Sequence, residues 1–157
     1  MNLLMNKAST SVQAVQRSEA IRRTILRVHS GALMLVAVAS TANAMAGHFG
    51  GVGAYAFLRE NPLAYVGLHQ AYLLMLVVAT TMWFGAAEPN TRRWHMVAIL
   101  AHSAVLTAVL LDWNVFPALG FGKVALGSAI FHSLWIVVEA SAASFLVRRG
   151  DAGSMIV

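Results

Sequence analysis

Four blocks of apolar residues constrain this chain more than any other feature of its sequence. An α-helix rises 1.5 Å per residue, so about 20 apolar residues cross a hydrocarbon core of about 30 Å. Of the 157 residues, 59% are hydrophobic and only 11% are charged, whereas a soluble domain carries about 25% charged residues. The pattern therefore predicts an all-α integral membrane protein, a bundle of four transmembrane helices.

The apolar blocks are separated by connections that hold glycine, proline and charged residues, which mark the ends of helices. We predict a cytoplasmic N-terminal segment over 1–27, one transmembrane domain over 28–147 and a cytoplasmic tail over 148–157. The N-terminal segment is too polar to span a membrane, so it forms either a short interfacial helix or a solvated tail. The predicted spans are 28–47, 63–84, 94–115 and 124–147.

Lysine and arginine are distributed unevenly among these segments. The N-terminal segment, the connection between the second and third spans, and the C-terminus hold all of them except Arg59 and Lys123. Because cytoplasmic segments are enriched in these residues, both termini are predicted to lie in the cytoplasm, with the chain in a bacterial-type inner membrane. The basic residues sort by connection and form no single patch, so we expect no nucleic-acid partner.

Small residues mark the faces through which the helices are expected to pack. The first span is rich in alanine and glycine, and the fourth ends in the run Ala140 to Ser144. Helices in lipid associate where small residues let their backbones approach closely. We expect these faces to pack inside the bundle, to bind another membrane subunit, or both.

Each span also carries a histidine, and the fourth carries a glutamate. The rise per residue places His102 and Glu139 about 5 Å to the cytoplasmic side of the midplane. It places His132 about 5 Å, and His69 about 8 Å, to the opposite side. Ionisable groups that face lipid are costly, so these side chains should point inward. We predict that Glu139 pairs with His102, and His132 with His69.

Three interpretations of these polar residues remain open. The side chains are contacts between helices, ligands of haem b or of a chlorophyll-type pigment, or a metal or proton-relay site built on His102 and Glu139. For haem, His69 and His132 are the ligand pair best matched in depth, and His29 with His102 is a second, poorly matched pair. A haem protein of this kind would exchange electrons with a partner and with quinone.

Other classes of function lack their sequence signatures. The chain has no cysteine, which excludes iron–sulfur clusters and zinc–thiolate sites. It also has no H-E-x-x-H sequence, phosphate loop or nucleophile elbow, and its connections are too short for a catalytic domain. The leading hypothesis is a small non-catalytic subunit of a larger membrane complex that converts energy or transfers electrons, in contact with lipid and other membrane subunits.

Overall fold

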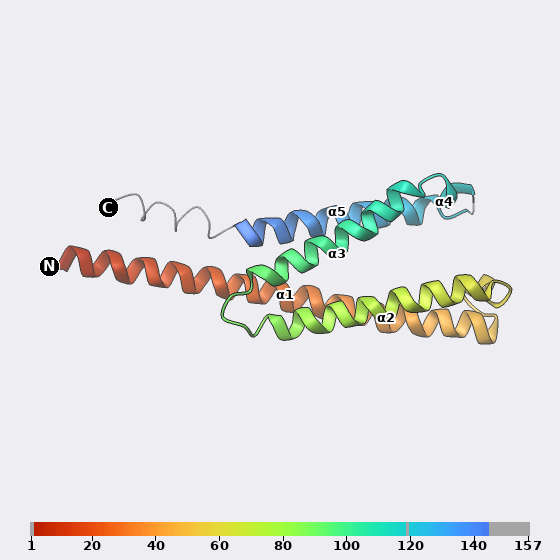
Figure 1. Cartoon of the computed structure of the whole chain (residues 1–157), viewed down its shortest axis with the longest axis horizontal. Coiled ribbons are helices and arrows are strands. Elements are labelled where there is room, and N and C mark those ends of the chain that lie inside the picture. Colours follow the sequence, from red (N-terminus) through yellow and green to blue (C-terminus); the bar gives the residue numbers. More distant parts are fainter. Residues whose placement is uncertain (1, 119, 145–157) are drawn as a thin grey trace. The chain divides into compact units, whose positions relative to one another are not determined.

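The computed structural model describes the backbone of residues 2–118 and 120–144, and side chains from residue 13 onward within those ranges. Four of the helices it describes are long and apolar enough to cross a membrane. The chain divides into two compact units. Unit 1 comprises Met1–Ile25 with Ala86–Val157, and unit 2 comprises Leu26–Gly85. Within each unit, helices that follow one another in the chain run antiparallel (Figure 1).

The first helix is much longer than its predicted span. Helix α1 runs without interruption over Asn2–Gly50 (Figure 1), and its membrane-length part covers Gln13–Gly50. The helix passes through residues 27 and 28 without a break, and the predicted start of the membrane span at that position stays a prediction. The stretch before Gly31 contains neither glycine nor proline, so nothing in it breaks a helix. Whether the first turns lie in a membrane interface stays a prediction.

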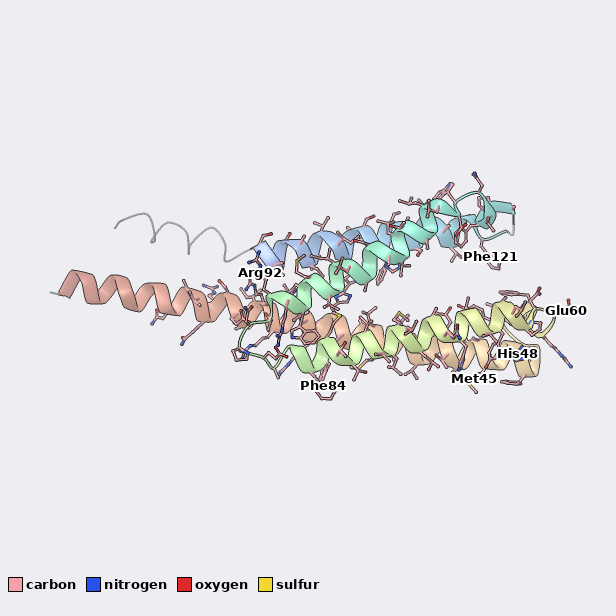
Figure 2. The ribbon with its side chains drawn as sticks, in the orientation of Figure 1. Met45, His48, Glu60, Phe84, Arg92 and Phe121 are labelled. Carbon is pink, nitrogen blue, oxygen red and sulfur yellow. The ribbon has the colours of Figure 1, made fainter. Side chains whose placement is uncertain are left out.

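Unit 2 is a helical hairpin made of the second half of α1 and helix α2, Pro62–Gly85. A short 3₁₀ helix, η1 (Ala56–Arg59), lies in the connection. Figure 2 shows His48 on the last turns of α1, at the end of the hairpin where Glu60 lies, and Phe84 at the other end. A Cβ atom on Gly31 would contact the Trp83 ring at 3.7 Å, so the two helices approach closely there.

Small residues make this hairpin tight, as the sequence predicts. Ala37 and Ala44 are buried on α1, and seven residues separate them, which places both on one face. A Cβ atom on Gly47 would collide with the backbone of Tyr55. Other alanines of α1 lie on a different face and are exposed, among them Ala32, Ala39 and Ala46.

Unit 1 contains helix α3 (Arg92–Leu111), the short helix α4 (Val115–Ala118) and helix α5 (Gly122–Ser144). Helix α3 ends four residues before its predicted end. The sequence Asp112-Trp113-Asn114 follows it, and the N–H of Asp112 still reaches Ala108 O at 3.0 Å. The predicted end of the fourth span, at residue 147, lies outside the described residues, as does the tail.

Two segments that the arginine distribution assigns to the cytoplasm meet the last described turns of α5 at one end of unit 1. Arg22 on α1 donates to the carbonyl oxygens of Ala142 at 2.8 Å and of Ala143 at 2.9 Å. It thereby binds two backbone carbonyl groups in the last described turns of α5. Arg23 donates to Glu88 O at 3.1 Å, in the connection that leads to α3. We refer to the end of unit 1 that holds Arg22, Arg23 and the start of α3 as the basic end of unit 1.

Candidate functional site

The most buried ionisable pair in the described chain joins α3 to α5. His95 lies in the first turn of α3 and Glu139 in the last turns of α5, and neither side chain has any exposed surface. Nδ1 of His95 and Oε2 of Glu139 are in direct hydrogen-bond contact. A carboxyl group buried in an apolar span is costly unless it is paired in this way.

A second pair lies seven residues further along the same two helices. Nδ1 of His102 and Nδ1 of His132 are 2.6 Å apart. One ring must donate its N–H and the other must accept, so the two imidazoles hold different tautomers or share one extra proton. The Trp135 ring is stacked against His102 with a 6.3 Å centroid separation, and Phe131 also contacts both imidazoles. Apolar aromatic surface therefore surrounds this pair.

The pairing differs from the one that depth predicts. Glu139 is hydrogen-bonded to His95, where the prediction named His102. His132 is hydrogen-bonded to His102. The prediction aligned the midpoints of two assumed spans, and the observed register is displaced from that alignment by about six residues, or about 9 Å. The register follows from which residues pack, and a further step of seven along both helices brings Val109 and Ala125, both buried, to matching positions.

The His102–His132 contact has the geometry of a hydrogen bond. Two nitrogens on one tetrahedral zinc ion lie about 3.3 Å apart, because each Zn–N bond is about 2.0 Å. The His102–His132 nitrogens are closer than that, at 2.6 Å. Within residues 2–118 and 120–144, no three His, Asp or Glu side chains gather as a metal site. The assignment of His102 and Glu139 as metal ligands stays a prediction.

The remaining histidines belong to unit 2. His29 is fully buried on α1. His48 Nδ1 contacts Leu58 O at 2.9 Å, and its ring is stacked on Tyr65 with 4.0 Å between centroids. Nδ1 of His69 is buried and has no hydrogen-bond partner in the described protein. Because His102 and His132 lie in unit 1, the proposed haem pairs His69–His132 and His29–His102 stay predictions.

Two parts of the site are absent from the sequence-based assignment. His95 is not among the predicted site residues, although its spacing of seven from His102 places both on one face of α3. Trp135 and Phe131 are aromatic residues within an apolar span, so nothing in the sequence separates them from lipid-facing side chains. Their contact with His102 depends on how α5 is rotated about its axis.

The helices of the described chain indicate which class of protein this is. The described chain is all-helical, and four of its helices are long and apolar enough for a multi-pass membrane protein. Comparison with protein-family models, with characterised proteins and with solved structures finds no match for this chain.

Proposed function

We propose that this protein is a small non-catalytic subunit of a larger membrane complex. We propose further that the two pairs of ionisable side chains between helices α3 and α5 carry protons for that complex. The observation that supports the proposal most directly is the buried hydrogen bond between His95 and Glu139. The His102–His132 bond, in the same register, adds a second proton-exchanging pair. Membrane-embedded histidines and carboxylates of this kind mark proton relays.

The chemistry of these groups suits proton transfer. An imidazole can accept a proton on one nitrogen while it releases another from the opposite nitrogen. A carboxyl group alternates between an acceptor and an O–H donor. Both described contacts join atoms whose donor and acceptor roles can exchange, and such an exchange moves a proton without moving a helix.

The spacing of the two pairs shows what else the proposed relay needs. Seven residues of helix separate His95 from His102, which places the pairs about 10 Å apart along α3. A proton cannot cross that distance in one hydrogen-bond step. Under the proposal, water between the two helices completes the path.

Two further features support the role of a subunit. The described connections, at residues 51–61, 86–91 and 112–121, leave no room for a catalytic domain. On α1, Ala32, Ala39 and Ala46 are exposed at intervals of seven residues, and such a line of small residues is typical of helix contacts in membranes. We propose an inner-membrane location with the basic end of unit 1 in the cytoplasm, as the arginine distribution favours.

Proton flux in liposomes tests the proposed relay. The full chain is reconstituted with a pH-sensitive dye inside, and a potassium gradient with valinomycin sets the membrane potential. We expect the wild type to acidify or alkalinise the lumen according to the sign of the potential. Glu139→Gln, which keeps the size of the side chain but cannot release a proton, should reduce the flux to that of protein-free liposomes.

The matched control is Glu60→Gln, since Glu60 is an exposed carboxylate in unit 2. This variant should retain the wild-type flux. Wild-type liposomes that behave like empty ones, or a Glu139→Gln variant as active as the wild type, would reject the relay. Migration of the gently solubilised native protein as a bare 16.8 kDa chain would reject the subunit role.

Haem or pigment binding is a second candidate because of His69. A haem ligand binds iron through one imidazole nitrogen while the other usually donates to a protein group. Nδ1 of His69 is buried and has no hydrogen-bond partner in the described protein, so this is the nitrogen that is left available to bind a metal. For His132, the other predicted ligand, Nδ1 can donate to His102, which leaves its second ring nitrogen for the metal. A bound haem would supply electron transfer between quinone and a partner subunit.

A reduced-minus-oxidised absorption spectrum of the purified chain tests this second candidate. Haem bands that disappear in His69→Leu and in His132→Leu would support it. A spectrum without haem or pigment bands from protein isolated from its native membrane would reject it.

A further inference from the structure

Buried polar atoms without a hydrogen-bond partner gather at the basic end of unit 1. In the described side chains, these atoms are Nε of Arg23, Oγ1 of Thr91, Nε1 of Trp94 and Nε2 of His95. Among the described side chains, the one other such atom is Nδ1 of His69, in unit 2. Buried polar groups in native proteins are nearly always hydrogen-bonded to protein or to ordered water, so this concentration of partnerless atoms calls for a ligand.

The four atoms come from adjoining positions. Thr91, Trp94 and His95 are separated by three and four residues, so they share one face at the start of α3. Thr91 already has a helical conformation, and its carbonyl accepts the N–H of Trp94 at 2.9 Å. Glu19 Oε1 accepts the N–H of Thr91 at 3.0 Å, and Arg23 lies one turn after Glu19 on α1.

The chemistry of these groups selects water as the ligand. The indole N–H of Trp94 and the guanidinium N–H of Arg23 only donate, so they disfavour a metal cation. The carboxylate of Glu19 already occupies the neighbouring position and contacts Arg22, which disfavours an anion. Thr91 Oγ1 and His95 Nε2 can each donate or accept. Water combines both roles and typically makes about three hydrogen bonds in such sites.

We propose that ordered water molecules bound by Thr91, Trp94 and His95 connect the carboxyl group of Glu19 to the buried His95–Glu139 pair. This inference rests on the proposed relay and identifies Glu19 as its cytoplasmic end. A proton leaves the Glu19 carboxyl group for water, and water passes a proton to Nε2 of His95. His95 then releases the proton on Nδ1 to the Glu139 carboxylate. Water and His95 each gain and lose one proton, Glu19 loses one that it regains from the cytoplasm, and Glu139 gains one that it passes onward along the relay.

Hydration of the cluster can be measured without any assay of transport. Magic-angle-spinning NMR of the full chain in bilayers, with ¹⁵N-labelled histidine, detects magnetisation transfer from water protons to Nε2 of His95. A His95→Gln sample assigns the signal among the 6 histidines. We expect transfer in the wild type and in Thr91→Ser, which keeps the hydroxyl, and loss of transfer in Thr91→Val. A wild-type protein with no transfer at His95 Nε2 would overturn the inference.

The flux assay separates this inference from the relay itself. If Glu139→Gln abolishes flux but Glu19→Gln and Thr91→Val do not change it, the relay stands and protons enter elsewhere. If the wild type shows water at His95 Nε2 but conducts no protons, the relay is rejected, and with it the role of Glu19. Loss of flux in Glu19→Gln together with the water signal supports both proposals.

Discussion

The Nδ1 atoms of His102 and His132 lie 2.6 Å apart across the interface between α3 and α5. With the His95–Glu139 bond one step of seven residues away, this contact determines the antiparallel register of the two helices. Repeats of seven residues keep the same helix faces opposed over several turns. The polar groups of α3 and α5 are therefore matched in pairs in this register.

The His102–His132 contact should appear as coupling between mutations. Each single substitution, His102→Leu or His132→Leu, removes this hydrogen-bond partner from the other imidazole and should destabilise the protein by about 1–3 kcal/mol. In the double variant the loss should fall short of the sum by about 0.6–1.7 kcal/mol. Unfolding in mixed detergent micelles measures these free energies. Ser133→Ala, at an exposed neighbouring position, should change stability little, and strictly additive losses would contradict the contact.

The register predicts a specific cross-link between α3 and α5. The chain has no native cysteine, so any disulfide that forms must join the two introduced cysteines. Val109→Cys with Ala125→Cys places two thiols at matching buried positions, and mild oxidation should form an intramolecular disulfide. Val109→Cys with Leu126→Cys should not, because Leu126 is 52% exposed and about 100° further around the helix. Electrophoresis under non-reducing conditions distinguishes them. Equal cross-linking of both pairs would argue against this register.

Gly47 should tolerate no side chain. A Cβ atom there collides with the backbone of Tyr55, which cannot move aside as a flexible side chain can. Gly47→Ala should therefore destabilise the protein by about 1–3 kcal/mol. Gly67 on α2 is the matched control, since nothing lies within 4 Å of a Cβ atom there. Gly67→Ala should stabilise its helix by up to about 1 kcal/mol. Thermal unfolding in detergent measures both, and opposite signs are the expected result.

Arg22 should hold the end of α5 in place. Its Nε and Nη2 atoms donate to two carbonyl oxygens in the last turns of that helix. Lysine cannot reproduce this two-point contact, so Arg22→Lys should raise amide hydrogen exchange near residues 139–144. The corresponding loss of local stability is about 1.5–3 kcal/mol. The exposed Arg17 serves as the control, and Arg17→Lys should leave exchange there unchanged. Unaltered exchange in Arg22→Lys would contradict the proposed role of the contact.

Much of the helical architecture follows from the sequence because its signals are local. Apolar blocks of membrane length place α2, α3 and α5 within a few residues of their observed bounds. Where boundaries differ, local chemistry explains the difference. Helix α3 stops at Asp112, and α1 continues through the arginine-rich stretch before residue 28 because charge alone does not end a helix.

The candidate site is less accessible to sequence reasoning. His102, His132 and Glu139 stand out because ionisable residues are rare in apolar spans. The sequence does not reveal how these residues pair. The ends of α3 and α5 cannot be predicted exactly, so the axial position of one helix relative to the other stays undetermined. A displacement of about 9 Å exchanges one set of partners for another. Thr91 and Trp94 resemble ordinary residues at a helix start, and their unpartnered atoms become apparent only when burial is known.

The sequence by itself determined that this is an all-helical chain with four helices suited to a membrane, and that a few ionisable groups lie within them. Those properties depend on composition and spacing along one segment at a time. Only the tertiary structure decided that Glu139 bonds to His95 and His102 to His132. Register and rotation between helices depend on the shapes of both packed surfaces, and in lipid no general hydrophobic force selects them.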